Sequence, residues 1–218
     1  MKKLSCIVSI LYVIAAVLFT ATFSIGLPIY ARQFYFSQID DLELEKESGA
    51  TKEQIKESYN ELIDYLTIPN AEFSTGVFEY SEEGKSHFED CKHLFLLNGT
   101  VLLISAAFLA AAEILDKTKK LPLARRDLLA IAGGTTLSVC TVLTVLVAID
   151  FDRAFTAFHK LFFAGKDNWV FDSETDEIIK ILPADFFANC AILIGAGIIV
   201  LSVLFIVIGI VKKRIFTK

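Results

Sequence analysis

Four long apolar runs limit what this chain can fold into. They cover residues 4–27, 94–115, 128–149 and 186–211, and the only charged residue within them is Glu113. A bilayer core about 30 Å thick is crossed by roughly 20 helical residues, so each run is long enough to span a membrane. Because no water satisfies backbone groups there, each run must be a helix. A hydrophobic content of 54% and a mean hydropathy of +0.55 agree with this interpretation. We predict an α-helical integral membrane protein with four transmembrane helices.

The charges beside the runs predict an orientation. Lysines and arginines gather before residue 4, between residues 116 and 127, and after residue 211. By the positive-inside bias these segments are cytoplasmic, so both termini are expected inside the cell. The first run follows Lys2 and Lys3 as a signal sequence does, but its 24 residues exceed the roughly 7–15 of a signal core, and we expect an uncleaved anchor.

The predicted organisation alternates membrane helices with outward-facing segments. Residues 28–93 and 150–187 carry 23 acidic and 10 basic residues, so the outer face is acidic and no nucleic-acid partner is expected. The predicted parts are a transmembrane helix at 1–27, an extracellular cap at 28–93, a transmembrane helix at 94–115, a cytoplasmic loop at 116–127, a transmembrane helix at 128–149, an extracellular interfacial segment completing the cap at 150–185, and a last transmembrane helix with a cytoplasmic tail at 186–218.

The cap is predicted to be small and mixed in secondary structure. Thr51 with Gln54 forms a capping box, and apolar residues up to Leu66 recur on one helical face. Alternation of apolar and acidic residues over 39–47 favours a strand, and residues 76–80 favour another. Ser86 with Glu89 is a second capping box, so a helix is expected to start at His87 and to continue into the second span.

The second outer segment begins with a stretch rich in phenylalanine, "FDRAFTAFHKLFF" at 151–163. Phe155, His159, Phe162 and Phe163 have the spacing of one helical face, which predicts a helix lying along the membrane interface. A turn at 167–172, a short helical stretch at 174–182, and Pro183 in the first turn of the last membrane helix are expected to follow.

Aromatic residues are concentrated in the two outward-facing segments. Of 26 aromatic residues, 10 lie in 28–93 and 9 in 150–187. An ordinary aromatic belt would enrich both membrane faces, chiefly in Trp and Tyr, whereas here the excess is one-sided and mostly Phe. The pattern favours a ring-lined chamber that opens outward at membrane level. The alternative is that these rings form only the core of the cap.

All three histidines, at positions 87, 93 and 159, lie in the outward-facing segments. Any one of them has an ordinary structural interpretation. His159 lies among rings that disfavour its cation, so it is expected to be neutral and able to accept a proton. His87 is expected at a helix N-terminus, where unpaired N–H groups favour a developing oxyanion, with Asp90 close enough to orient the ring. His93 is interpreted as an interfacial residue.

Other chemistries are less well supported by the sequence. His87, Asp90 and His159 could make a three-ligand metal site, but without a His-x-x-x-His or Cys-x-x-Cys pair we expect neither metal nor cofactor. The absence of Gly-x-Ser-x-Gly argues against a serine nucleophile. Spans without ionisable residues near their middle argue against a transporter or pump. The four cysteines show no disulfide framework and are expected to be free.

The motifs around the two histidines resemble those of a known family. "RAFTAFHKLFF" at 153–163, "DNW" at 167–169, "DEIIKILPADFF" at 176–187 and "SHFEDCK" at 86–92 are together similar to the bacterial lipoprotein intramolecular transacylases, Lit. The resemblance implies a multi-pass enzyme of the cell membrane. It would move the sn-2 acyl chain of a diacylglyceryl-modified lipoprotein to the α-amino group of that lipoprotein's N-terminal cysteine.

The resemblance also implies that His87 and His159 are the catalytic residues. The candidate supporting residues that would orient the reacting groups are Arg153, Asp90, Asn168 and Asp176. The candidate pocket-lining residues are Phe155, Phe158, Phe162, Phe163 and Trp169. We expect a monomer whose partners are the lipoprotein substrate and membrane lipid. The alternative function is a non-enzymatic membrane scaffold or sensor, in which the cap binds a partner and the histidines are ordinary core residues.

Overall fold

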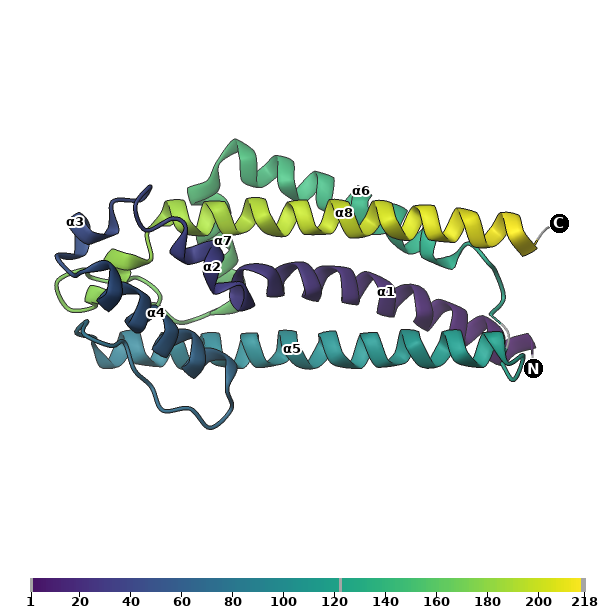
Figure 1. Ribbon diagram of the computed structural model, residues 1–218, viewed down its shortest axis with the longest axis horizontal. Coiled ribbons are helices and arrows are strands. Elements are labelled where there is room, and N and C mark those ends of the chain that lie inside the picture. Colours follow the sequence, from purple (N-terminus) through teal and green to yellow (C-terminus); the bar gives the residue numbers. More distant parts are fainter. Residues whose placement is uncertain (1, 122, 217–218) are drawn as a thin grey trace. The chain divides into compact units, whose positions relative to one another are not determined.

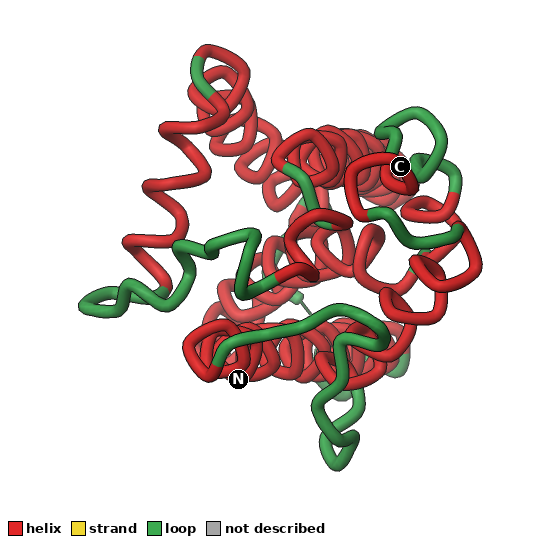
Figure 2. The backbone as a smooth tube through the Cα atoms, turned by 90° about the vertical axis from the view of Figure 1, so that its left-hand side faces the viewer, coloured by secondary structure: helices red, strands yellow, loops and turns green. Residues whose placement is uncertain are grey.

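The structure is a computed structural model that describes residues 2–121 and 123–216. Every regular element in these two ranges is helical (Figures 1 and 2). In chain order the elements are α1 (Lys2–Tyr30), α2 (Arg32–Phe36), α3 (Leu44–Ser48), α4 (Lys52–Thr67), α5 (Glu82–Lys117), α6 (Leu128–Ile149), α7 (Phe151–Phe162), the 3₁₀ helix η1 (Glu177–Ile181) and α8 (Ala184–Phe216). The helices α1, α5, α6 and α8 are long and apolar enough to cross a membrane, which confirms the prediction of four spans.

The prediction of a mixed cap is wrong. Residues 39–43 form turns and continue into α3, and residues 76–80 are a turn and loop. The apolar residues that suggested alternation are buried without any strand: Ile39 and Leu44 are both fully buried. Alternation over so few residues also fits a compact turn that buries two side chains, and backbone hydrogen bonds from Leu42 to Gln38 and from Leu44 to Ile39 stabilise that turn.

The contacts divide the chain into two compact units. Unit 1 comprises Met1–Leu27, Asn98–Val145 and Leu193–Lys218, and unit 2 comprises Pro28–Leu97 and Leu146–Ile192. In unit 1 the start of α1, the connection between α5 and α6, and the end of α8 lie at the same end (Figure 1). This arrangement is the one that four successive membrane crossings require.

A close helix contact at a glycine and a charged cluster around Glu113 help to hold unit 1 together. A Cβ on Gly133 would lie 2.4 Å from the Ser202 carbonyl oxygen, so glycine here lets α6 approach α8 closely. Glu113 accepts hydrogen bonds from Lys212 at 2.5 and 2.6 Å and from the Tyr12 hydroxyl at 2.5 Å. The one charged residue in the apolar runs is therefore paired.

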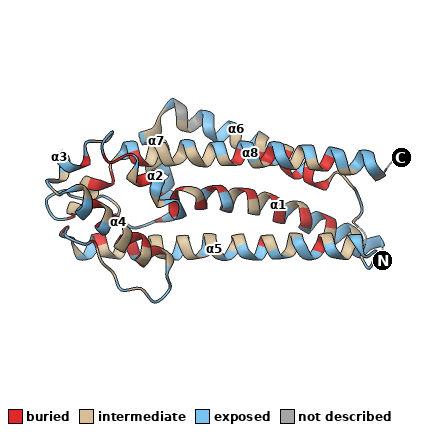
Figure 3. Ribbon diagram, in the orientation of Figure 1, coloured by how far each residue is buried: buried red, intermediate tan, exposed pale blue. Residues whose placement is uncertain are grey.

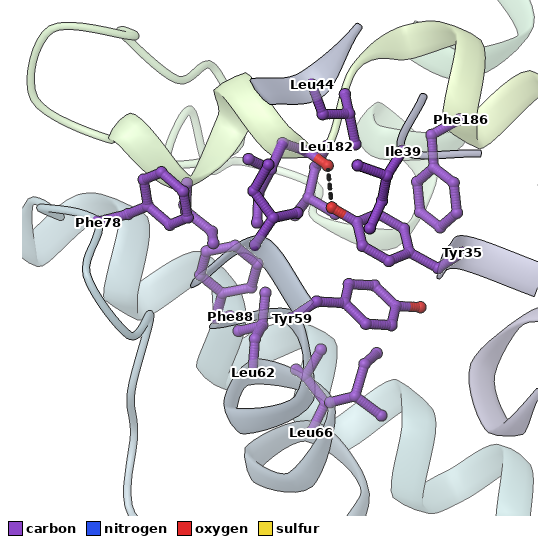
Figure 4. Close-up of a cluster of buried hydrophobic side chains, with 14 of the residues drawn as sticks. Tyr35, Ile39, Leu44, Tyr59, Leu62, Leu66, Phe78, Phe88, Leu182 and Phe186 are labelled. Atoms are coloured by element: carbon purple, nitrogen blue, oxygen red, sulfur yellow. Dashed lines mark hydrogen bonds between the residues drawn. The ribbon is translucent and has the colours of Figure 1, made fainter. Parts of the chain in front are cut away.

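Unit 2 has an aromatic and aliphatic core built on α4. The Thr51 and Gln54 capping box is present, and the predicted apolar face of α4 is buried as expected. Tyr35 stacks on Tyr59 with ring centroids 3.7 Å apart, and its hydroxyl donates to the Ile181 carbonyl at 2.8 Å (Figure 4). The core of unit 2 joins the segment before α4, helix α4 itself and the segment around η1 (Figure 3).

Helix α5 starts earlier than predicted. It begins at Glu82 instead of His87, after Ser81, whose hydroxyl accepts a hydrogen bond from the Gly84 N–H at 2.9 Å. Ser86 and Glu89 lie inside the helix, where their capping-box spacing has no capping role. At 1.5 Å per residue this 36-residue helix is about 54 Å long, more than a bilayer core requires. The charged part that precedes residue 94, which includes His87, therefore lies outside the membrane-spanning run.

Candidate active site

The structure brings the two predicted histidines together within unit 2. His87 lies on α5 and His159 on α7, and their ring centroids are 5.8 Å apart with an angle of 28° between the ring planes. Both are buried, with exposed fractions of 5% and 8%. The two candidate catalytic side chains therefore lie side by side. Histidine is the most common general acid and base in enzymes, so this pair of rings is a candidate for acid–base catalysis.

Aromatic side chains surround both imidazoles. The His87 ring lies 4.7 Å from Phe163 and 5.4 Å from Phe171, centroid to centroid. The His159 ring lies 4.2 Å from Phe155 and 5.0 Å from Trp169. These rings replace water around the imidazoles with apolar surface, and such a setting penalises charge.

Burial keeps both imidazoles neutral near pH 7. The pKa of His87 is lowered to about 4, mainly by burial and also by the neighbouring His159 and Lys166, and the Asp90 carboxylate only partly opposes this shift. Burial also lowers the pKa of His159, against the opposing effect of its hydrogen bond to the Phe155 carbonyl. A neutral imidazole can accept a proton at one nitrogen and donate one at the other, so both rings are ready for acid–base chemistry.

The hydrogen bond of His159 fixes which of its nitrogens is the acceptor. Its Nδ1 lies 2.8 Å from the carbonyl oxygen of Phe155, one turn earlier on α7. A carbonyl oxygen only accepts, so Nδ1 carries the proton of the neutral ring and donates it. The lone pair therefore lies on Nε2, and this nitrogen is free to act as a base.

His87 presents a different set of contacts. Its Nε2 lies 3.3 Å from the Sγ atom of Cys91, whereas its Nδ1 is buried and has no hydrogen-bond partner. Three buried side-chain polar atoms lack a partner in the described parts of the chain, and two of them, His87 Nδ1 and Asn168 Oδ1, belong to this site. Buried polar groups are normally paired, so two unpaired polar atoms at one site distinguish it from the rest of the described chain.

Asn168 is held in one orientation by its amide nitrogen. Nδ2 donates to Asp90 Oδ2 at 3.2 Å and to Ser86 Oγ at 3.4 Å. The amide nitrogen must face the carboxylate, because the amide oxygen would be repelled there. The unpaired Oδ1 atom is therefore an acceptor directed away from Asp90.

The Asp90 carboxylate accepts hydrogen bonds from both Asn168 and Lys166. Lys166 Nζ donates to its two oxygens at 2.6 and 2.7 Å. Partial burial raises the pKa of Asp90, but the hydrogen bonds from Lys166 and Asn168 outweigh this effect and the net pKa is lowered. Asp90 is therefore ionised, and it links α5 to the segment that follows α7.

Comparison with known proteins identifies the family of the chain. The family model of the lipoprotein intramolecular transacylase Lit matches residues 10–187. The chain belongs to the Lit family. Its structure is similar to that of the membrane-integral lipoprotein intramolecular transacylase Lit from Bacillus cereus, with a TM-score of 0.88 and 26% identity over 99% of this chain and 100% of that one.

Two further solved structures are variants of the same Bacillus cereus Lit. One has a histidine replaced by arginine and matches with a TM-score of 0.80 and 26% identity, covering 97% of this chain and 94% of that one. The other has that histidine replaced by alanine and matches with a TM-score of 0.80 and 25% identity, covering 95% and 93%. A comparison with curated protein sequences found no match to the chain. Membership of the Lit family favours a transacylase over a membrane scaffold or sensor.

Of the other predicted supporting residues, Asp176 lies at the start of α5, the helix that carries His87. It is 4% exposed and accepts hydrogen bonds from the backbone N–H and the hydroxyl of Ser81, at 2.8 and 2.9 Å. Ser81 in turn caps α5. Asp176 thus stabilises the start of the helix that carries His87 and has no direct contact with either imidazole.

Arg153 lies on the exposed face of α7. Its side chain is 90% exposed and forms an ion pair with Asp150 at 2.9 Å. It shares a shallow surface hollow with Lys160 and Thr156.

The predicted lining residues fall into two groups. Phe155, Phe163 and Trp169 contact the imidazoles, and Phe163 is only 5% exposed. Phe158 reaches the His159 ring edge-on at 5.4 Å but is 47% exposed, and Phe162 is 51% exposed and packs on Phe158. On the helix Phe162 lies at one edge of the face that holds Phe155, His159 and Phe163, and this edge is exposed.

Sequence reasoning missed three residues of the site and misplaced one. Cys91, Lys166 and Phe171 all contact it, and only Cys91 had a usable signal, its helical spacing from His87. His87 is the sixth residue of α5, so the expectation of unpaired backbone N–H groups beside it is wrong. The hypothesis of a metal site at His87, Asp90 and His159 gains no support, because residues 2–121 and 123–216 contain no cluster of three potential ligands.

Proposed function

We propose that this Lit-family chain moves the sn-2 acyl chain of a diacylglyceryl-modified lipoprotein to the α-amino group of that lipoprotein's own N-terminal cysteine. The product is a lyso-form, N-acyl lipoprotein. One observation carries the proposal: two neutral imidazoles lie in contact, one with a free acceptor nitrogen and the other with an unpaired buried nitrogen. A single acyl transfer requires one group that accepts a proton and one that stabilises negative charge.

The reaction needs no further reactant. The amine nitrogen attacks the ester carbonyl, a carbon–nitrogen bond forms, and the bond between the carbonyl carbon and the glycerol oxygen breaks. The amine loses one proton and the glycerol oxygen gains one, so an ester and an amine become an amide and an alcohol. Acid–base groups alone can therefore catalyse it.

His159 is assigned as the base. Its Nε2 lone pair accepts the proton of the attacking amine, and the resulting imidazolium returns this proton to the departing glycerol oxygen. General acid–base catalysis of this kind contributes typically about 10²–10⁴-fold. The hydrogen bond from Nδ1 to the Phe155 carbonyl supports this assignment, because it holds the ring in one tautomer and strengthens when the ring becomes cationic.

His87 is assigned as the group that polarises the ester carbonyl. Its Nδ1 is buried and unpaired, which suits a donor that finds its acceptor only when substrate is bound. The unpaired Oδ1 of Asn168 is assigned to the second reacting group, since an acceptor there can hold an N–H of the amine. Asp90 and Lys166 orient Asn168 and thereby act through it.

The aromatic surroundings supply positioning and exclude water. Both reacting groups belong to one substrate molecule, so the enzyme has to hold a flexible lipid head in an attack geometry. Well-oriented intramolecular reactions gain up to about 7–11 kcal/mol from this restraint. Phe163 and Trp169 lie against the imidazoles and keep out the water that would otherwise hydrolyse the ester.

We infer the orientation in the membrane from the charges beside the apolar runs. We place both termini in the cytoplasm and residues 28–93 and 150–185, with the histidine pair, at the outer face of the cell membrane. The basic residues beside the apolar runs support this topology. All catalytic groups belong to one chain, and a monomer is therefore the assembly we propose.

The test is acyl migration by the purified protein in lipid nanodiscs with a synthetic diacylglyceryl lipopeptide. Mass spectrometry with fragmentation locates each acyl chain. His87→Ala and His159→Ala are each expected to lower the rate by at least about 10²-fold while the protein stays folded. His93→Ala, a change at an exposed histidine on the same helix, serves as the control and is expected to retain activity. Full activity in either of the first two variants would overturn the assignment.

A further inference from the structure

We propose that Cys91 is a positioning residue that fixes the tautomer of His87. Its thiol donates a hydrogen bond to His87 Nε2, so the ring's own proton stays on Nδ1, where it can be donated to substrate. This inference rests on the function proposed above and adds a residue to it. Cys91 acts only through His87 and takes no part in bond making or breaking.

The geometry of α5 brings the two side chains together. Residues four apart on a helix lie on the same face, one above the other. The Sγ atom of Cys91 is 3.3 Å from His87 Nε2, which is within hydrogen-bond distance for sulfur. His87 is 5% exposed and is enclosed by Phe163 and Phe171, so its ring cannot turn to find another partner without disturbing these contacts.

The chemistry of the two groups determines the direction of the hydrogen bond. A neutral imidazole has one N–H, and its other nitrogen is a strong acceptor, whereas a thiol sulfur is a poor acceptor and carries its own proton. A hydrogen bond from the thiol to Nε2 uses the better acceptor. The opposite tautomer would spend the ring's only N–H on sulfur, a poor acceptor. Nδ1 lacks a partner in either tautomer, so the stronger hydrogen bond at Nε2 decides between them.

The surroundings keep the thiol proton in place. Burial raises the pKa of the Cys91 thiol to about 12, with a further contribution from the Asp90 carboxylate. A thiol that stays protonated can donate throughout the physiological pH range. For the same reason Cys91 is not a nucleophile, because only the thiolate attacks a carbonyl.

The two histidines therefore have different roles: His159 is left with an acceptor nitrogen and His87 with a donor. His159 donates from Nδ1 to the Phe155 carbonyl and is left with a free acceptor at Nε2. His87 accepts at Nε2 from Cys91 and is left with a free donor at Nδ1. Two different neighbours thus make one imidazole a base and the other a donor, although both rings are neutral.

The test has a spectroscopic and a kinetic part. The protein contains three histidines, so ¹⁵N-histidine labelling with long-range ¹H–¹⁵N spectra in detergent resolves each ring, and His87→Gln assigns the His87 signals. In the wild-type protein His87 is expected to carry its proton on Nδ1. In Cys91→Ala the Nε2–H form is expected to appear, and in Cys91→Ser the Nδ1–H form is expected to persist, because the hydroxyl replaces the thiol as donor.

The rate of acyl migration is measured on the same variants. Cys91→Ala is expected to lower kcat about tenfold with KM little changed, the size of effect expected for the loss of one weak hydrogen bond that acts in the transition state. Cys91→Ser is expected to restore the rate to within about twofold of wild type. Cys190→Ala is the matched control, since Cys190 is also partly buried and packs against the same core. It removes the same volume and is expected to leave rate and tautomer unchanged.

Several results would overturn the proposal. A wild-type His87 protonated on Nε2 contradicts it directly, and this measurement needs no substrate and no altered protein. Full activity of Cys91→Ala, or equal losses in Cys91→Ala and Cys190→Ala, would assign to Cys91 a packing role alone. If the wild-type protein shows no acyl migration, the proposed function fails while the tautomer measurement still decides the role of Cys91.

Discussion

Lys166 and Asp90 form an ion pair that connects the two parts of the chain carrying the histidines. Lys166 lies in the segment after α7, and its Nζ donates to both oxygens of Asp90, at 2.6 and 2.7 Å. Asp90 lies three residues after His87 on α5. The contact between the two imidazoles, which themselves share no hydrogen bond, is thus supported by a charged contact one turn away.

The ion pair predicts that Asp90→Ala lowers the rate of acyl migration more than Lys166→Met does. The Lys166 side chain is 49% exposed, and ion pairs of this kind contribute about 0–1 kcal/mol, so Lys166→Met is expected to lower the rate of acyl migration less than about fivefold. Asp90→Ala should cost more, because Asp90 also binds the Asn168 amide at 3.2 Å and fixes its orientation. Rates measured in nanodiscs at low and high salt check this ranking. A larger loss in Lys166→Met than in Asp90→Ala would contradict it.

The lowered pKa of His87 predicts a loss of stability in mild acid. In the unfolded chain a histidine binds its proton near pH 6.5, whereas burial holds the folded His87 neutral down to about pH 4. The unfolded state therefore binds more protons between these values, and stability is expected to fall as the pH is lowered from about 6.5 to about 4. Thermal unfolding in detergent over this range tests the sign.

A variant isolates the contribution of His87 to this pH dependence. His87→Gln keeps a polar side chain of similar size but cannot titrate. We expect its melting temperature to change less between pH 7 and pH 5 than that of the wild-type protein. An identical pH dependence in the two proteins would show that other groups are responsible.

The sequence allowed the four spans and the start of α4 to be predicted for identifiable physical reasons, whereas His87 and His159 were paired as catalytic residues on the resemblance to Lit. Apolar runs of more than 20 residues have no alternative to a membrane helix, and the capping box at Thr51 fixes a helix start locally. The cap beyond this was not predictable. Ile39 and Leu44 are buried by a core that includes Ile178 and Ile181, far away in the chain, and such tertiary contacts override a short local pattern.

In the candidate active site, too, contacts between residues far apart in the sequence could not be predicted from local patterns. The start of α5 was misplaced because two capping residues, Ser81 and Ser86, compete in the sequence, and only the distant Asp176 decides in favour of Ser81 through its hydrogen bonds at 2.8 and 2.9 Å. Helical spacing correctly put His159 with Phe155 but also included Phe162, because a four-residue pattern does not say how wide the buried stripe is. Lys166 had no local signal at all, since its partner lies 76 residues away.

Adjacent phenylalanines at the end of α7 are expected to respond differently to truncation. Phe163 is 5% exposed and lies 4.7 Å from the His87 ring, so Phe163→Ala opens a cavity beside the imidazole. Such changes cost about 3–5 kcal/mol in a packed core, and both stability and the rate of acyl migration should fall. Phe162→Ala removes a ring that is 51% exposed and should leave the stability in detergent nearly unchanged. Melting temperatures of the two variants in the same detergent test the difference, and equal losses would contradict it.

The close approach of Asp176 to Gly84 predicts that a side chain at position 84 destabilises the protein. A Cβ on Gly84 would lie 2.1 Å from the Asp176 carboxylate oxygen and 3.0 Å from a Phe171 ring carbon. Asp176 is buried and holds both the backbone N–H and the hydroxyl of Ser81, so it cannot move aside without loosening the start of α5. Gly84→Ala is therefore expected to destabilise the protein by about 1–3 kcal/mol, the usual cost of overpacking, and to lower the rate of acyl migration by displacing Phe171 from His87.

Gly134→Ala provides the matched control for this change. It adds the same methyl group within α6, where an added Cβ would meet nothing within 4 Å. Alanine is the better helix former by about 1 kcal/mol, so this variant should be as stable as the wild-type protein or slightly more stable. Thermal unfolding and acyl migration are measured on both variants. If Gly84→Ala matched Gly134→Ala in both measurements, the contact between Asp176 and the first turn of α5 would not be what holds His87 in place.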